Sequence, residues 1–261
     1  MPIQAGAWKA GSRNDSNFAA YISRAAQASA RSSQSKSVED LPDRTSASLF
    51  GELYADYRRY RAAGARSALS VIALTQGFWA SAIFRISHWA LKRFNFPVLR
   101  TVINAICILL QKLIELLTGI SIPAGCSIGA GLYIGHFGGI FVDSDCRIGR
   151  NCNLSQGVTI GKGGRGALQG VPVVGDRVHI GANALLLGKI TIGNDAVIGP
   201  GAVVMSSVPE RGVAMGNPAR VVGLDGSFEF VHYDDMEKDP HRLPEIQPAT
   251  VLTTPKSSGK S

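Results

Sequence analysis

A single histidine stands among glycines in a setting that would leave its imidazole open to a ligand. Residues 134–140 read Ile-Gly-His-Phe-Gly-Gly-Ile, so His136 follows one glycine and precedes two more. Glycines remove side chains that would shield the ring, and they allow a ligand to come close. Imidazole titrates at about pH 6.5, so His136 could take a proton from an attacking hydroxyl as a general base. A structural histidine is the alternative that the residues alone leave open.

A glycine-rich stretch further along the chain carries a second set of polar side chains. Residues 162–172 read Lys-Gly-Gly-Arg-Gly-Ala-Leu-Gln-Gly-Val-Pro and lack the aliphatic spacing of the segments around them. We expect a protruding loop, in which Lys162 and Arg165 could meet phosphates or a sugar acid. A solvated loop with incidental charge is the alternative. The glycines alone are weak evidence for a phosphate site, because no helix pattern follows them.

Short strands must position these residues, because an aliphatic side chain returns at every sixth position. The positions are Ile122, Ile128 and Ile134, then, after a slip of two residues, Val142, Ile148, Leu154 and Ile160, and, after the loop, Val174, Ile180, Leu186, Ile192, Ile198 and Val204. Such a repeat cannot bury its apolar side chain alone, so successive repeats stack as a parallel β-helix. Cys126, Cys146 and Cys152 share the inward fifth position of their repeats, which indicates core residues and not a disulfide or metal set.

Three motifs together resemble the hexapeptide-repeat acyltransferases, and within them the serine acetyltransferase-like group. They are residues 134–140, Val158-Thr159-Ile160-Gly161 and Gly216-Asn217-Pro218-Ala219-Arg220. The resemblance covers about residues 121–223 and implies a mainly β fold, a left-handed parallel β-helix. The left hand comes from the resemblance, because the spacing of the repeats alone does not give it. It also implies a homotrimer with active sites between subunits, acetyl-CoA as co-substrate, and His136 as the base. The loop, with Arg165 and Gln169, would border the acceptor pocket of a neighbouring subunit, as it does in the resembled enzymes. The positions that match the family's coenzyme A contacts are Gly161, Lys162, Ala182 and Pro200.

The chain departs from this group at positions that handle serine. The family's serine enzymes have an Asp that orients the base where this chain has Ser121, an Asp where it has Gly135, and an Arg-His pair where it has Gly170-Val171. We therefore expect the branch that O-acetylates sugars in exopolysaccharide or capsule synthesis, with a sugar or lipid-linked saccharide as acceptor. Serine O-acetylation in cysteine biosynthesis and a non-catalytic trimeric scaffold stay open as alternatives. Ser121, Asp143, Asp145 or a backbone carbonyl are the candidates to orient His136.

Residues 47–120 change to the period of helices. Leu49, Leu53, Tyr54 and Tyr57 predict the apolar face of a first amphipathic helix, with arginines on the other side. Two more apolar segments, 67–84 and 98–117, are interrupted by Thr75-Gln76-Gly77 and by charged residues, so neither is predicted to span a membrane. We expect a helical cap on the open end of the solenoid. An additional contact with an anionic membrane, through Arg85, Lys92, Arg93 and Arg100, is the alternative.

Composition sets the remaining expectations. Residues 1–46 and 224–261 are rich in small and polar residues and are predicted to be disordered tails around the cap and the 121–223 acetyltransferase domain. The net charge of +8 favours anionic partners, but no nucleic-acid motif accompanies it. We expect a cytoplasmic protein, on the inner face of the membrane if it binds there. Only His136 and His179 lie in the repeats, and His179 is expected to face outward, so no zinc site is expected.

Overall fold

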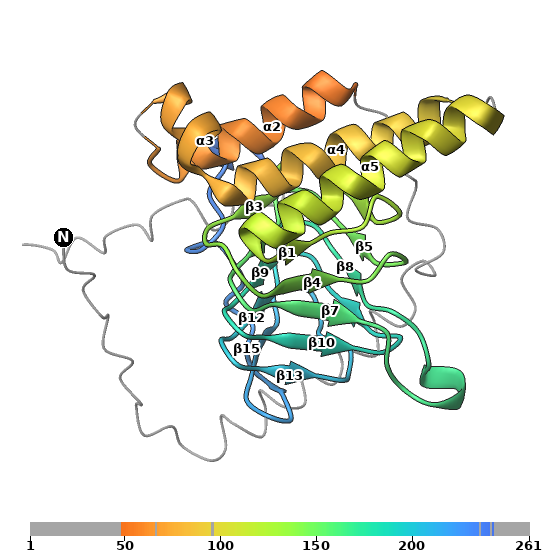
Figure 1. Cartoon of the computed structure of the whole chain (residues 1–261). Helices are drawn as coiled ribbons and strands as arrows, with labels where there is room; N and C mark the ends of the chain where they lie inside the picture. The colour runs from red at the N-terminus through yellow and green to blue at the C-terminus, as the bar shows by residue number, and fades with distance from the viewer. Residues whose placement is uncertain (1–47, 66, 95–96, 235, 241, 243–261) are drawn as a thin grey trace, which may run out of the picture. The chain divides into compact units, whose positions relative to one another are not determined.

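The computed structural model describes residues 48–234 apart from 66 and 95–96, together with 236–240 and 242. All of these belong to one compact unit, Leu41–Ser261. The helices α2 (Leu49–Ala62), α3 (Ala68–Leu74), α4 (Gln76–Arg93) and α5 (Pro97–Thr118) come first, and strands follow to β15 (Figure 1). The predicted N-terminal tail, 1–46, and the end of the predicted C-terminal tail, 243–261, lie outside the described residues.

The strands are short and form three sheets, each of which makes one face of a solenoid. The first sheet contains β1 (Ile120–Ser121), β4 (Ile140–Val142), β7 (Thr159–Gly161), β10 (Leu185–Leu187) and β13 (Val203–Val204). The second contains β2 (Ser127–Ile128), β5 (Arg147–Ile148), β8 (Val173–Val174) and β11 (Thr191–Ile192). The third contains β3 (Tyr133–Ile134), β6 (Asn153–Leu154), β9 (His179–Ile180), β12 (Val197–Ile198), β14 (Val213–Met215) and β15 (Arg220–Gly223). From β1 to β13 every third strand returns to the same sheet in parallel. β14 also pairs in parallel with β12, and β15 is antiparallel to β14. This is the predicted parallel β-helix.

Coil length exceeds its regular value at two places. Phe141 pairs with Thr159, which lies three repeats further along the chain, the regular length of a coil. Ile134 pairs with Leu154 across a longer coil, and Thr159 pairs with Leu185 across one that is longer still. The first insertion lies in the corner between β3 and β4, and the larger one lies in the loop between β7 and β8. Both irregularities fall on segments that the sequence singles out for chemistry.

The interior of the solenoid is filled by the side chains that the repeat predicts. The aliphatic position of every predicted repeat, from Ile122 to Val204, is buried. Cys126, Cys146 and Cys152 are buried beside these residues as free thiols. Burial raises the pKa of Cys146 and of Cys152 to about 12, so both stay protonated at neutral pH and are poor nucleophiles. The prediction that these cysteines are core residues is confirmed.

The helices α2 and α4 cover the end of the solenoid where the first coil has no coil above it. β2 and β3 are edge strands there, so the backbone of this coil needs other partners. Asp56 accepts hydrogen bonds from the backbone N–H groups of Gly131 and Leu132, at 2.9 and 2.8 Å. Arg85 donates to the carbonyl of Ile128 at 2.6 Å and pairs with Asp56 at 3.0 Å. Asp56 and Arg85 therefore bond to backbone groups of the first coil that a preceding coil would otherwise satisfy.

The buried face of α2 differs from the predicted one. The side chains that face the solenoid are Glu52, Asp56, Arg59 and Tyr60, which are all buried. Tyr54, on the predicted apolar face, is 61% exposed. A simple apolar moment fails here because the surface that α2 covers consists of backbone N–H and carbonyl groups, which need polar partners. The expectation that the arginines all face away is wrong for Arg59, which donates to the carbonyl of Gly131 at 3.1 Å.

The two apolar helical segments behave differently from each other. The break predicted at residues 75–77 is present, because α3 ends at Leu74, α4 begins at Gln76, and the two helices meet at 79°. In contrast, the charged residues of α5 do not interrupt it. Val98–Thr118 is long and apolar enough to cross a membrane by length and composition, and 11% of its most apolar stretch is buried. Length and composition alone do not test whether α5 crosses a membrane, so the prediction that neither segment spans one stays a prediction.

The first part of the predicted C-terminal tail packs on the third sheet. The hydroxyl of Ser227 donates to the carbonyl of Arg177, and Val231 is buried. Arg242 and Arg177 both pair with Asp195, at 3.0 and 2.7 Å. Residues 224–242 thus belong to the folded unit wherever they are described, and the predicted domain end at residue 223 falls inside it.

Candidate functional site

His136 lies in the enlarged corner between β3 and β4, where its side chain is exposed. Gly138 and Gly139 turn the chain here with φ angles of +97° and +67°, a region that costs other residues strain. The carbonyl of Gly138 accepts a hydrogen bond from the backbone N–H of Gly157 in the next coil, at 3.0 Å. A Cβ atom on Gly139 would lie 3.3 Å from the Cα of Gly157. The glycines therefore return the chain to the solenoid just after it presents the imidazole at the surface.

The helical cap holds the strand that leads into His136. The hydroxyl of Tyr60 accepts from the backbone N–H of Ile134 at 3.2 Å and donates to its carbonyl at 3.3 Å. A Cβ atom on Gly77 would come within 2.3 Å of the carbonyl oxygen of Ile134, so only glycine lets α4 pack this closely. Burial raises the pKa of Tyr60 well above its usual value, so the hydroxyl stays a donor. Neither Tyr60 nor Gly77 is predicted by the repeat pattern, because both lie outside it.

No group in the described part of the chain forms a hydrogen bond with His136. Asp143 accepts instead from the backbone N–H of Asp145 at 3.0 Å, within its own turn. Ser121 lies in β1, whose partner residue in β4 is Phe141. The sequence candidates for orienting the base therefore do not contact it within one chain.

A column of residues continues from His136 along the same corner, through the coils that follow. The residues at the third repeat position of this corner are, coil by coil, His136, Gln156, Ala182 and Pro200. The backbone N–H of Asn183 donates to the carbonyl of Gln156 at 2.9 Å, and that of Gly201 donates to the carbonyl of Ala182 at 2.8 Å. Two of the predicted coenzyme residues therefore share the corner of His136. Sequence reasoning missed Gln156, although its repeat position was the available signal.

The other two predicted coenzyme residues lie at the opposite end of the first sheet. Gly161 closes β7 and is buried opposite Leu187 of β10, while Lys162 follows it and is exposed. A strand rises about 3.3 Å per residue, so β7 separates the two corners by roughly 10 Å. One chain thus has two separate groups, Ala182 and Pro200 with His136, and Gly161 and Lys162 with the loop.

The predicted loop is present between β7 and β8 and protrudes from the solenoid (Figure 1). Gly163 and Gly170 exchange two backbone hydrogen bonds of 3.0 Å each, which close its base. A short helical turn, η2 (Gly166–Leu168), forms its tip, and Arg165 and Gln169 on either side of this turn are exposed. The polar side chains of the loop therefore lie away from His136 of the same chain.

His179 is less exposed than the repeat pattern predicts. Its ring stacks on Phe230 of the C-terminal segment, with 4.8 Å between the ring centroids and 26° between the planes. Burial under this segment lowers the pKa of His179 to about 4, because the charged imidazolium loses its hydration there. The expectation of an outward surface residue is corrected: the side chain points outward, and residues beyond the repeats cover it.

We predict that acid destabilises the parent protein more than a His179→Gln variant. The folded pKa lies below the unfolded value of about 6.5, so the unfolded state takes up a proton first as the pH falls. The free energy of unfolding should decrease between about pH 6.5 and about pH 4, and this contribution should be complete above that window. Urea unfolding of both proteins at neutral pH and at about pH 4.5 measures the difference. An equal decrease in the free energy of unfolding of the two proteins would contradict a lowered pKa of His179 in the folded state.

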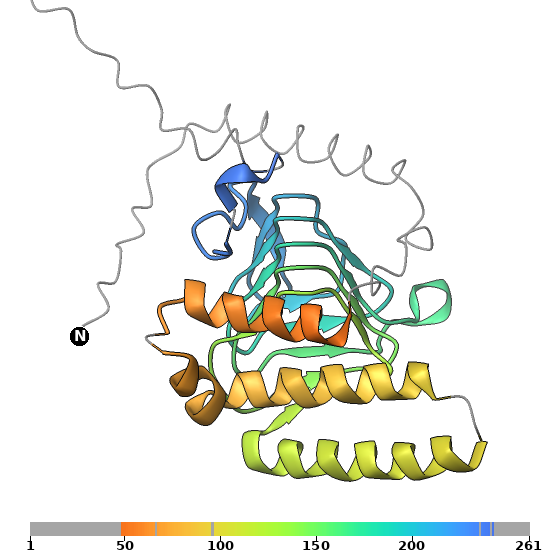
Figure 2. The ribbon, with the colours of Figure 1, turned by 90° about the horizontal axis from the view of Figure 1, so that it is seen from above.

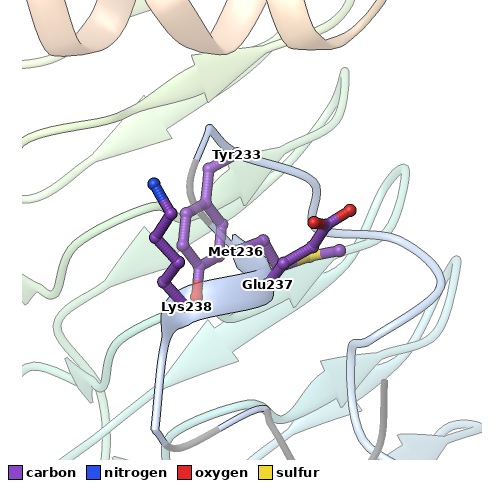
Figure 3. A pocket seen from close by; sticks show the side chains of 4 residues that line it. All are labelled: Tyr233, Met236, Glu237 and Lys238. Atoms are coloured by element: carbon purple, nitrogen blue, oxygen red, sulfur yellow. The ribbon is translucent and has the colours of Figure 1, made fainter. Parts of the chain in front are cut away.

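The C-terminal segment also forms a recess of its own, lined by Tyr233, Met236, Glu237 and Lys238 (Figure 3). Its lining comes from one short stretch around η3 (Met236–Lys238) and includes none of the predicted site residues. Among the residues that the structure describes, no group of three His, Cys, Asp or Glu side chains could hold a metal ion. The exposed imidazole at the enlarged corner thus stays the best candidate for chemistry.

Known proteins share both the sequence and the fold of this chain. The family described as "Bacterial transferase hexapeptide (six repeats)" matches residues 172–205. A serine acetyltransferase of Synechococcus elongatus is 34% identical over 180 residues, which are 68% of this chain and 70% of that protein. The soybean serine acetyltransferase complexed with serine is 32% identical with a TM-score of 0.60, over 67% of this chain and 70% of that one. A serine acetyltransferase in complex with CoA is 30% identical with a TM-score of 0.58, over 67% and 69%.

These likenesses confirm the left-handed parallel β-helix with its helical front end, and they overturn one prediction. The sugar acceptor and the role in exopolysaccharide synthesis are wrong, because the matching proteins are named serine acetyltransferase. Side chains missing at Ser121, Gly135 and Gly170-Val171 do not exclude serine, since the described residues of one chain leave the surroundings of His136 open and other groups can contact the acceptor there. The chain belongs to the serine acetyltransferase family of hexapeptide-repeat transferases.

Proposed function

We propose that this chain transfers an acetyl group from acetyl-CoA to the hydroxyl of L-serine, with His136 as the general base. The observation that carries the proposal is an exposed imidazole in an enlarged, glycine-built corner, in a chain whose relatives are named for this reaction. The solved relatives that hold serine and CoA support the choice of both substrates.

The reaction follows from the chemistry of imidazole. Neutral His136 removes the proton from the serine hydroxyl while the oxygen attacks the thioester carbonyl, which gives a tetrahedral intermediate. When this intermediate collapses, the C–S bond breaks and the proton passes from the imidazolium to the departing thiolate. The products are O-acetylserine and CoA, and His136 is neutral again. An exposed histidine in a glycine-built turn can do this because no side chain of its own corner blocks the approach.

The column that continues from His136 suits the arm of coenzyme A. Ala182 and Pro200 carry small side chains without hydrogen-bonding groups, which leaves the backbone of the corner accessible. Lys162, exposed at the far end of β7, would meet the phosphates at the other end of the cofactor. The net charge of +8 also favours an anionic co-substrate.

A homotrimer would complete the site. On the outer face of the first sheet, Phe141 is 49% exposed. Leu185 and Val203 pair with each other further along the same sheet. The third sheet is already covered by the C-terminal segment of its own chain, through Phe230. Packing through the first sheet would bring the loop of one chain to the His136 corner of the next. Arg165 and Gln169 would then contact the acceptor, and the neighbouring chain would supply the group that orients the base.

A thiol-release assay tests the proposal. The purified full chain should release free CoA thiol from acetyl-CoA when L-serine is added, at a rate that saturates with serine. With acetyl-CoA alone, release should stay at the level of buffer, because His136 then has no hydroxyl to activate. A folded protein that shows no serine-dependent release would contradict the proposal and would favour the scaffold alternative.

A further inference from the structure

The helix α5 exposes large apolar side chains along most of its length. The exposed ones are Val98, Leu99, Val102, Ile106, Ile108, Leu109, Leu113, Leu116 and Leu117. Leu109 and Leu116 are 69% and 84% exposed. Isolated apolar side chains on a surface need no explanation, but a continuous apolar helix surface marks an interaction site.

The side of α5 that packs on the protein is narrow. Cys107 is buried, and Gln111 donates to the carbonyl of Ile122 at 2.8 Å. Figure 2 shows α5 beyond α4, on the outer side of the helical layer. α4 itself packs on the first coil through Gly77 and Arg85. The α4 and α5 pair is therefore fixed along the solenoid end, with the apolar side of α5 left open.

The charges around this surface are almost all positive. Arg100 at the start of α5 is exposed, as are Lys92 and Arg93 at the end of α4. Between residues 76 and 118 the sole acidic residue in the sequence is Glu115. Glu115 pairs with Lys112 of the same helix at 2.9 Å. The surface thus combines an apolar stripe with an excess of positive charge.

Arg85 does not belong to this charged set, although the sequence suggests it does. Its side chain is 1% exposed and pairs with Asp56 at 3.0 Å and with Glu52 at 3.5 Å. A membrane-facing role for Arg85 is therefore wrong. Trp89, which is 41% exposed on α4 and stacks edge-on against Phe94, lies near the basic end instead.

We propose that α5 docks this protein on the surface of an anionic lipid bilayer. A helix with an apolar face and basic neighbours lies in the interface with its apolar side chains among the acyl chains. Lys92, Arg93 and Arg100 then meet the lipid phosphates, and tryptophan side chains favour this depth. The helix lies along the membrane and does not cross it, because its partner α4 is held on the first coil. A second copy would bring the same positive charge to this face, whereas an anionic bilayer complements it.

Vesicle co-sedimentation of the full chain tests the proposal. The parent should sediment with vesicles of phosphatidylcholine and phosphatidylglycerol at low salt, and much less with vesicles of phosphatidylcholine alone. Each basic residue near an anionic surface contributes about fivefold to partitioning, so the triple variant Lys92→Gln, Arg93→Gln and Arg100→Gln should bind roughly a hundredfold more weakly. The double variant Leu109→Glu and Leu116→Glu should lose binding to both kinds of vesicle, because it removes the apolar contact.

Met205→Glu provides the matched control, since Met205 is 60% exposed on the solenoid, after β13. This variant should bind vesicles like the parent, and circular dichroism should show all variants folded. No binding by the parent, or undiminished binding by the two α5 variants, would overturn the proposal. A parent that ignores vesicles but changes its molar mass in light scattering on Leu109→Glu and Leu116→Glu would also overturn it, and would assign the face to a second copy. Thiol release is measured separately, so failure here leaves the enzymatic proposal untouched.

Discussion

Replacement of His136 with Ala should lower the turnover of serine by roughly 10²–10⁴ and leave the fold intact. This factor is the usual worth of a positioned general base. The fold should persist because the side chain is exposed and makes no hydrogen bond within the described part of the chain. Steady-state thiol release with saturating acetyl-CoA gives the rate, and thermal unfolding shows whether the variant is folded.

His179→Ala is the matched control for this prediction. It removes the other histidine of the repeats, which stacks on Phe230 away from the corner of His136. Its turnover at neutral pH should stay close to that of the parent. A folded His136→Ala variant with turnover near the parent value would remove His136 from the mechanism, whatever the control does.

Replacement of Asp56 with Ala should lower the free energy of unfolding by about 3–5 kcal/mol, the usual effect of breaking a buried ion pair. The change leaves the buried guanidinium of Arg85 without its main counter-charge. It also leaves the backbone N–H groups of Gly131 and Leu132 without an acceptor. Urea unfolding at neutral pH, followed by circular dichroism, measures the loss.

A double variant separates the ion pair from the rest of the cap. Asp56→Ala combined with Arg85→Met removes both charges, so it should be less destabilised than Asp56→Ala alone. If Asp56→Ala lowered the free energy of unfolding by less than about 1 kcal/mol, the ion pair would not hold the cap on the first coil. Loosening of α2 should also disturb the site, because Tyr60 of this helix bonds to the strand before His136.

The repeat predicts the solenoid well because a single physical requirement acts at every sixth residue. Each inward position must be apolar, so Ile122 to Val204 could be placed in the core from sequence alone. The same logic located both irregularities, the slip before Val142 and the loop after Ile160. An interruption in a strict period is visible without any structure, and here both interruptions carry the candidate chemistry.

The polar contacts of the helical cap and the covering of the third sheet by the C-terminal segment could not be predicted in this way. Glu52, Asp56 and Arg59 are buried because they bond to the backbone of an edge coil, and no apolar period records that requirement. His179 is covered by Phe230, which lies beyond the last repeat in a segment without periodicity. Long-range contacts made by irregular segments leave little local signal, so their partners become clear only in the folded chain.

The candidate site was predictable to the extent that it lies within the repeat. His136 and Ala182 occupy the same repeat position, and the structure places them at one corner. The acceptor was mispredicted, because missing side chains at Ser121 and Gly135 were read as missing serine recognition. In a homotrimer the neighbouring subunit can supply such contacts from the same sequence, but the sequence does not show which of its residues reach the corner of His136.

One measurement tests the central claim most directly. The full chain is incubated with L-serine and with acetyl-CoA labelled in the acetyl group. The product is identified by liquid chromatography with fragment-ion mass spectrometry before and after mild base, which moves an O-linked acetyl group to nitrogen without changing the mass. We predict labelled O-acetylserine in amounts equal to the released CoA, and its near absence with the His136→Ala variant. A folded parent that releases CoA without labelling serine would contradict the account. Equal labelling of serine by the parent and by the His136→Ala variant would contradict it as well.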